Sequence, residues 1–180
     1  MPAVMPETVK SDSNKLVVFV TTPPAASTGI PTVAEVNAAI FASLYIVGDF
    51  AVTPTQNTGA GPSKLGSSVT PTELGRTTYP AVDVQYTYVP QSLGTPGGAG
   101  NEVYEALVPG SQVTAVVLEG YDGQASEVAA GDVADIFLME VGKRRKGRTG
   151  DGEFDEVSVT QSLVVVGGEP IVEDHALAAS

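Results

Sequence analysis

The sequence predicts a mainly β fold, a β-sandwich or barrel with one or two short packed α-helices, long loops and terminal arms. Valine, isoleucine, threonine and aromatic residues gather in short runs, some of which alternate with polar residues. Glycine, proline and aspartate separate these runs, as they do where strands turn. Only two segments carry helix start signals, and both are short. With 180 residues and 42% apolar content, the chain can bury the core of one domain.

The first expected elements are a strand and a capped helix. Residues 15–22, KLVVFVTT, are β-branched and aromatic and stop at a proline pair, which predicts a strand. In the following PTVAEVNAAI, Thr32 can cap a helix, and Glu35 stands three residues later to complete a capping box. We therefore expect a short helix over residues 33–39.

The middle of the chain mixes strand signals with a long irregular segment. Residues 41–47 fit both periods, but their aromatic and β-branched content favours a strand. Residues 53–79 are rich in Gly, Ser, Thr and Pro and hold only a weak strand signal at residues 65–70, so we expect a long loop that crosses to another surface. Residues 81–89, AVDVQYTYV, alternate strictly and predict a strand with one buried face.

The C-terminal half predicts one more helix and three strands. Asn101 is an N-cap candidate for a helix of about two turns in NEVYEALVPG. The runs QVTAVVLEGY, GDVADIFLMEV and EVSVTQSLVVVGG follow, separated by turn chemistry. The last run, residues 157–166, would extend about 33 Å at roughly 3.3 Å per residue. Because an unpaired strand of this length would be an aggregation-prone edge, we expect it to pair with an assembly partner.

The composition predicts a single domain with additions at both ends. Residues 1–14 are polar and show no period, so we interpret them as an N-terminal arm. Residues 15–167 form the β domain, which carries the long loop 53–79 and a charged hairpin at residues 142–156, and residues 168–180 form a C-terminal tail. Since no core is apparent for the arm, the loop and the tail, we expect all three to act between subunits.

The charge balance excludes several classes of partner. Twenty-one acidic and nine basic residues give a formal net charge of −12, which repels nucleic acid phosphates and anionic membranes. The longest apolar stretch, residues 38–48, is about half as long as the roughly 20 residues of a membrane-spanning helix, so we expect no membrane partner. The chain has no cysteine and therefore neither a disulfide framework nor a thiolate nucleophile.

No motif in the sequence predicts catalysis. The single histidine, His175, lies in the tail without a nearby partner, and we interpret it as a solvated residue. GTPGGAG lacks the spacing and context of a dinucleotide-binding loop, and DGEFDE departs from the calcium-loop pattern. Asp132 and Asp135 could in principle pair as acid and base, but they lie at the start of a strand, where turn chemistry better explains Asp132. We expect no catalytic, cofactor or metal site and no enzyme activity, whereas a β-rich binding module, which needs no motif, stays open.

One stretch of the sequence concentrates charge of both signs. Five of the nine basic residues lie in VGKRRKGRTGDGEFDEV, residues 141–157, and four acidic residues follow them directly. These nine candidate contact residues are Lys143, Arg144, Arg145, Lys146, Arg148, Asp151, Glu153, Asp155 and Glu156. The stretch is open to three interpretations: a nucleic-acid contact, a solvated loop whose exposed ion pairs contribute little, or a contact between subunits. We favour the subunit contact, because adjacent blocks of opposite sign can mate in only one register.

The order of the motifs resembles a known family. PTVAEVNAAI, TQNT, ELGR, VDVQYTYVPQ, NEVYEALVPG, AAGDVADIF and VSVTQSLVVVGG follow one another at spacings similar to those of the major tail tube proteins of long-tailed, siphovirus-type bacteriophages, especially those of actinobacterial hosts. The resemblance covers roughly residues 31–168. Residues 142–156 are more highly charged than the family pattern, so the resemblance implies no role for them.

The resemblance implies a structural virion protein. In this family a β-sandwich with a packed helix forms hexameric rings, and the rings stack into a hollow tube, a conduit for the genome. It implies the tape measure protein, the tail terminator and the distal tail protein as partners, assembly in the host cytoplasm, and DNA that passes through the lumen without specific binding. An acidic wall would keep that DNA mobile. The alternative is a β-sandwich surface or adhesion module that binds glycans or proteins.

Overall fold

The computed structural model describes residues 13–66, 68–92 and 100–179. Of the predicted N-terminal arm, only Ser13 and Asn14 belong to these ranges, so the arm lies almost wholly outside the described residues. Within the described ranges, no helix is long and apolar enough to cross a membrane.

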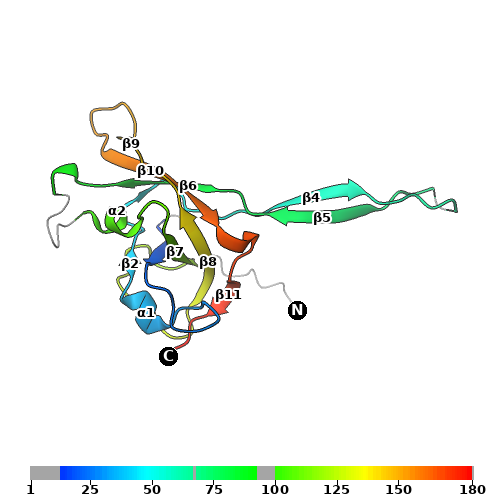
Figure 1. Ribbon diagram of the computed structural model, residues 1–180, viewed down its shortest axis with the longest axis horizontal. Helices are drawn as coiled ribbons and strands as arrows, with labels where there is room; N and C mark the ends of the chain where they lie inside the picture. Colours follow the sequence, from blue (N-terminus) through cyan, green and yellow to red (C-terminus); the bar gives the residue numbers. More distant parts are fainter. Residues whose placement is uncertain (1–12, 67, 93–99, 180) are drawn as a thin grey trace, which may run out of the picture.

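A nine-stranded antiparallel sheet forms the body of the molecule and curls into a half-barrel (Figure 1). Its strands follow the order β2-β1-β7-β8-β10-β6-β3, with β11 beside β8 and β9 beside β10. The strands are β1 (Lys15–Val20), β2 (Ile40–Phe41), β3 (Ile46–Val47), β6 (Val82–Thr87), β7 (Gln112–Glu119), β8 (Val133–Val141), β9 (Arg145–Arg148), β10 (Val157–Val165) and β11 (Val172–Ala176). The prediction of a mainly β fold is confirmed, and the curl gives it the barrel-like form.

One short segment joins the two ends of this strand order. β2 pairs with β1, and β3 pairs with β6 at the opposite end of the order. Between them a turn forms in which the Tyr45 amide donates to the Ala42 carbonyl over 2.9 Å. The single strand predicted at residues 41–47 is therefore wrong, because the chain turns there and bridges from one edge of the sheet to the other.

The central strands of the sheet are buried on both faces. Val17 and Phe19 of β1 point into the hydrophobic cluster inside the curl. Leu16, Val18 and Val20 point into a second cluster on the outer face. This double burial explains why residues 16–20 form a continuous apolar run rather than an alternating one. Each such side chain contributes roughly 1.5 to 3 kcal/mol by leaving water.

Helix α1 (Val33–Asn37) covers the outer cluster with Val36, which is fully buried. The predicted capping box is present. The Glu35 amide donates to Thr32 Oγ1 over 3.4 Å, and the Thr32 amide donates to the Glu35 carboxylate over 2.7 Å. The helix ends two residues earlier than predicted, and the Asn37 carboxamide bonds both backbone groups of Val128.

Helix α2 (Glu102–Ala106) forms where predicted, but its expected cap does not. Asn101 makes no side-chain capping bond. Its carboxamide instead accepts from the Val89 amide over 2.9 Å, donates to the Val89 carbonyl over 3.1 Å and donates to Ser92 Oγ over 2.8 Å. Asn101 thus pins α2 to the short 3-10 helix η1 (Pro90–Ser92), because its amide satisfies the backbone there better than at the helix start.

Strand β10 is paired along both of its edges within the chain. β6 runs along one edge, and β9 and then β8 run along the other. The expectation that this long strand pairs with an assembly partner is therefore wrong. Between β8 and β9, Gly142 continues the pairing along this edge of β10, because its amide donates to the Ser162 carbonyl. The absence of a side chain at Gly142 allows this close approach of the two backbones. A Cβ atom at Gly142 would lie only 2.7 Å from the Ser162 carbonyl oxygen.

The C-terminal tail belongs to the body rather than projecting from it. A second 3-10 helix, η2 (Val166–Gly168), leads from β10 to β11, which pairs with β8. Leu177 is buried in the outer cluster. His175 is half-buried and lies opposite Ala134, so its interpretation as a solvated tail residue is wrong.

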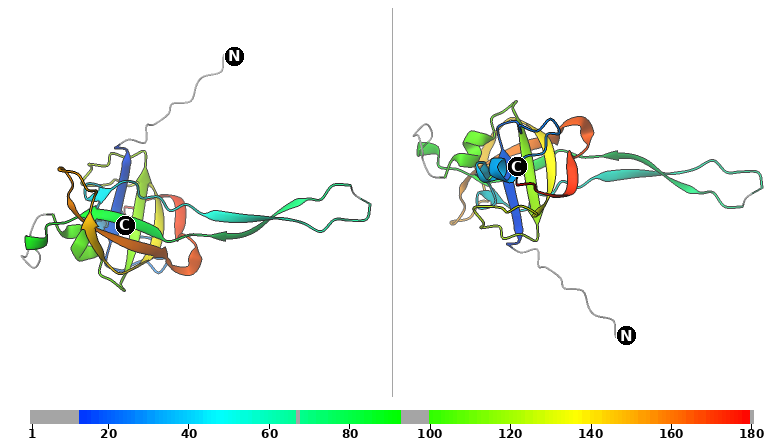
Figure 2. Two further views of the ribbon diagram at one scale, coloured as in Figure 1. Left: turned by 90° about the horizontal axis from the view of Figure 1, so that it is seen from above. Right: turned by 90° about the horizontal axis from the view of Figure 1, so that it is seen from below.

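Residues 53–79 contain a projecting hairpin instead of the predicted loop. β4 (Thr55–Ala60) pairs with β5 (Thr72–Thr78), and the pair extends far from the body (Figures 1 and 2). Every residue of both strands is exposed. The described residues of the weak strand signal at 65–70 form no strand. The threonine-rich strands have no buried face, so the apolar alternation that signals a strand is missing.

Candidate assembly surfaces

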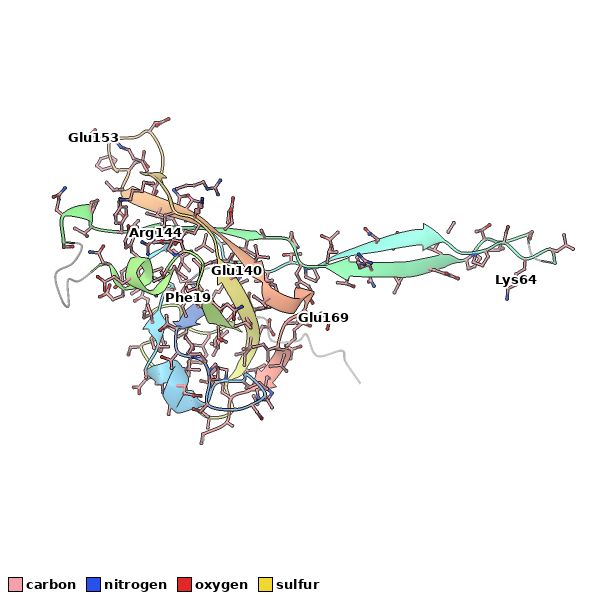
Figure 3. All side chains as sticks on the ribbon, viewed as in Figure 1. Phe19, Lys64, Glu140, Arg144, Glu153 and Glu169 are labelled. Carbon is pink, nitrogen blue, oxygen red and sulfur yellow. The ribbon has the colours of Figure 1, made fainter. Side chains whose placement is uncertain are left out.

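The charged stretch forms a hairpin, as predicted. β9 pairs antiparallel with β10, and residues 149–156 connect them. In Figure 3 Glu153 lies at the outer end of this hairpin, whereas Arg144 lies at its base beside the body. The nine candidate residues therefore do not share one environment.

Arg144 faces inward. Its Nη2 donates to the carbonyl oxygens of Tyr104 and Leu107, the latter over 3.0 Å, at the end of α2. Its guanidinium also lies 3.7 Å from the centre of the Tyr104 ring. A cation at this position satisfies helix carbonyls that have no partner within the helix. Arg144 therefore serves the fold, and it is not available as a contact residue.

The aromatic rings beside Arg144 extend this packing toward β9. Tyr104 stacks on Tyr88 with ring centres 5.0 Å apart, and Lys146 Nζ lies 5.8 Å from the Tyr88 ring. Beneath them the Tyr86 hydroxyl donates to Gln161 Oε1 inside the core. Burial raises the pKa of Tyr86 to about 12, although the nearby Arg144 opposes the rise.

Arg145 lies on the opposite, solvent-facing side of the sheet. Its Nη2 and the Asp83 carboxylate form an ion pair at 2.8 Å, and Ser162 Oγ donates to the same carboxylate. The bonds from Ser162 and Arg145 lower the pKa of Asp83. Both side chains of the pair remain more than half exposed, so the pair contributes little to stability.

Asp155 holds the turn of the charged hairpin together. Its carboxylate accepts from Thr149 Oγ1 over 3.0 Å and from the Gly152 amide. Cβ atoms added at Gly150 and Gly152 would lie 2.9 and 3.0 Å from this carboxylate. The two glycines therefore make room for a hydrogen-bonded turn.

The remaining candidates of the charged hairpin are exposed. They are Lys143, Lys146, Arg148, Asp151, Glu153 and Glu156. Sequence reasoning missed Phe154, which stands among the acidic residues with 94% of its surface exposed. A lone large apolar residue inside a polar turn was the signal that could have identified it, because such residues anchor protein contacts.

The β4–β5 hairpin carries three more exposed apolar residues. Leu65 and Val69, between the two strands, are fully and 69% exposed, and Leu74 on β5 is 73% exposed. Lys64 lies beside Leu65 at the far end, well away from the body (Figure 3). An isolated two-stranded hairpin is only marginally stable in water. This hairpin therefore has the features of a surface that another molecule covers.

A hollow of about 430 Å³ opens at the start of β1. Lys15 lies in it and forms ion pairs with Asp49 at 2.9 Å and Glu119 at 2.8 Å. Burial lowers the pKa of Lys15, but its bonds to the two carboxylates outweigh burial, so the pKa is raised. Leu44, 73% exposed, and Ile46 supply an apolar wall.

The acidic residues that could have formed a metal or acid-base site have other surroundings. Among the described residues, no three His, Cys, Asp or Glu side chains are grouped to hold a metal ion. Asp132 accepts from the Ala129 amide over 2.7 Å, and Asp135 accepts from the Asp174 amide over 2.8 Å, so both act as backbone partners.

Comparison with known proteins identifies the family. No curated protein matches the chain. The sequence model of a family described as phage tail tube protein matches residues 2–168, which is nearly the whole chain. Proteins of this family assemble with copies of themselves into the tube of the virion tail. The chain therefore belongs to the phage tail tube protein family, and it is a structural component of the tail tube rather than an enzyme.

Proposed function

We propose that this protein forms hexameric rings that stack into the tube of a long, siphovirus-type tail, and that the phage infects an actinobacterial host. The observation that carries the proposal is the β4–β5 hairpin, a long two-stranded element with no buried residue in its strands and no core of its own. Such a hairpin is only marginally stable in water by itself, and packing against another subunit would stabilise it. The order and spacing of the motifs from residue 31 to residue 168 support the actinobacterial assignment.

The tube conducts genomic DNA without holding it. The formal net charge of −12 repels phosphate, so a wall built from many copies keeps the duplex mobile. By resemblance to the family, the tape measure protein, the tail terminator and the distal tail protein are the other partners of the tube in this proposal.

Electron microscopy of the purified full-length chain tests the proposal. At high concentration, with short tail fragments added as seeds, we expect six-fold rings and tubes. Rings of another symmetry would contradict the hexamer. Seeded protein that stays monomeric and binds glycans would favour the alternative adhesion module instead.

The charged hairpin supplies a second subunit contact in this proposal. Its exposed basic residues face acidic residues of a neighbouring copy, with Phe154 as the apolar anchor. The test reverses Lys143 and Arg148 to Glu and follows tube formation against salt. Arg144 is excluded from the test because its substitution would disturb α2.

We expect fewer tubes at low salt, an unchanged monomer fold, and recovery when Asp151 and Glu153 are reversed to Lys in the same chain. Glu127→Lys, another exposed reversal, is the control and leaves assembly unchanged. Normal assembly of the Lys143 and Arg148 variant at low salt would mean that the stretch is a solvated loop.

A further inference from the structure

Among the described residues, no acidic side chain forms an ion pair with Lys64 at the end of the β4–β5 hairpin. We call Lys64 and Leu65 the hairpin tip. Three ion pairs form among the described residues, and none includes Lys64. The hairpin segment from residue 53 to residue 65 can extend about 43 Å at roughly 3.3 Å per residue. This length places the tip beyond the body of its own subunit. The tip therefore carries one exposed cation and one exposed apolar side chain, and Lys64 lies far from the body (Figure 3).

The hollow at the start of β1, which we call the Lys15 hollow, complements this pair of side chains. Leu44 offers an exposed apolar surface beside it. Asp49 and Glu119 place two carboxylates around a single ammonium group, so the hollow carries a net negative charge. Its volume of about 430 Å³ accommodates an apolar side chain together with the end of a lysine.

The other surfaces of the molecule fit less well. A second hollow of about 250 Å³ lies near Pro23, Pro24 and Leu138, and none of its lining residues is charged. It therefore offers no carboxylate to Lys64. The other exposed apolar tip, Phe154, stands among acidic residues that Asp49 and Glu119 would repel. Charge thus selects the hairpin tip, and not Phe154, for the Lys15 hollow.

We propose that the hairpin tip of one copy docks into the Lys15 hollow of a second copy, with Leu65 against Leu44 and the Lys64 ammonium beside Asp49 and Glu119. The inference rests on the proposed self-assembly and names the surface that receives the hairpin. The two mating surfaces differ, so every copy donates one tip and receives another. Contacts of this kind close into a ring or extend a stack, whereas a two-fold dimer would pair identical surfaces.

Disulfide trapping tests the contact, since the chain has no cysteine of its own. Leu65→Cys and Leu44→Cys are combined in one full-length chain, tubes are assembled under reducing conditions, and the tubes are then oxidised. A disulfide forms only when the two Cα atoms approach to about 4.4 to 6.8 Å. We expect a ladder of covalent oligomers on a non-reducing gel, and single-cysteine chains that stay monomeric.

A matched control uses the other apolar tip. The pair Phe154→Cys and Leu44→Cys is expected to give no ladder. A ladder from this control pair, or oxidised tubes of the Leu65 and Leu44 pair that contain only monomers, would overturn the docking while the proposed self-assembly stands. Failure of the unsubstituted chain to form tubes would overturn both. If the Leu65→Cys and Leu44→Cys chain does not assemble, Lys64→Cys with Asp49→Cys replaces it. A ladder of covalent oligomers from this second pair supports the docking, and oxidised tubes that contain only monomers overturn it.

A double-mutant cycle measures the charged part of the contact. Lys64→Gln and Asp49→Asn each slow tube growth at low salt, up to about fivefold for an exposed pair. If the two side chains meet, the double variant grows no more slowly than the worse single variant. Lys143→Gln with Asp49→Asn is the control. In this pair the fold-reductions in the rate of tube growth are expected to multiply, because the two side chains do not meet. Multiplying effects for the Lys64 and Asp49 pair would contradict the ion pair.

Discussion

Arg144 and Arg145 are neighbours in the sequence, yet their guanidinium groups have different surroundings. Arg144 bonds the carbonyl oxygens of Tyr104 in α2 and of Leu107 directly after it, and lies on a tyrosine ring, whereas Arg145 pairs with Asp83 at the surface. We expect Arg144→Ala to lower the free energy of unfolding by about 2 to 4 kcal/mol, since charged hydrogen bonds and a cation–π contact are lost. Arg145→Ala should lower it by less than about 1 kcal/mol.

Denaturant unfolding of the two monomeric variants measures this difference. We expect Arg144→Lys to lower the free energy of unfolding by less than Arg144→Ala. It keeps the charge, but an ammonium group cannot bond two carbonyls in the planar arrangement of a guanidinium. Equal effects of the alanine substitutions at Arg144 and Arg145 would show that the inward contacts of Arg144 contribute nothing.

Tyr86 makes the stability of the fold sensitive to alkaline pH. Its pKa is about 12 in the folded protein because burial disfavours the phenolate, and about 10 in the unfolded chain. The raised pKa means that its contribution is complete below about pH 10 and is lost between about pH 10 and 12.

The midpoint of urea unfolding, measured from pH 8 to pH 11.5, checks this prediction. The unfolding midpoint of Tyr86→Phe is expected to fall less steeply above pH 10 than that of the unsubstituted chain. At pH 8 it should be less stable by about 1 to 3 kcal/mol, because Gln161 loses its hydrogen-bond donor. Parallel curves for the two proteins would contradict the assignment to Tyr86.

At the scale of elements, the capping box of α1 is a local device with a measurable effect. Thr32→Ala removes the side-chain oxygen that accepts from the Glu35 amide, and should lower the free energy of unfolding by about 1 kcal/mol. Thr32→Ser keeps the oxygen and serves as the control. Thermal unfolding of both variants checks the prediction, and an alanine variant as stable as the serine variant would contradict it.

The β4–β5 hairpin is separable from the body of the fold. Replacement of residues 55–78 by a short Gly-Ser linker should leave the monomer's thermal midpoint within a few degrees, since both hydrophobic clusters keep their buried residues. The same variant should form no tubes under seeding. Circular dichroism and microscopy give the two readouts, and tubes of normal length would show that the hairpin has no role in assembly.

The sequence predicted an element correctly where the residues that cause it lie close together in the chain. Thr32 and Glu35 reveal a capping box because both partners lie within one turn, and the alternation in β6 reveals its buried face. The β4–β5 hairpin was missed because strands without a buried face show no such alternation. Arg144 was misplaced for a similar reason: its partners on α2 lie about 40 residues away and are backbone carbonyls, which no residue type signals.

At the scale of the whole molecule, the N-terminal arm is a proposed contact between subunits. Deletion of residues 1–12 should leave a folded monomer, because the described strands and helices begin at Lys15. We expect slower tube growth from the truncated chain, measured by light scattering at matched concentration. Growth at the rate of the full chain would show that the arm has no such role.

The rate of synthesis sets the earliest time at which β1 can pair with β7. Lys15 lies opposite Glu119, about a hundred residues later in the chain. A bacterial ribosome that adds about 5 to 20 residues per second makes the first strand wait roughly 5 to 20 s for its main partner. During that interval the apolar run LVVFV can pair with residues 40 and 41 of β2 but not with β7. The order of the strands along the chain therefore delays completion of the sheet until translation has passed residue 119.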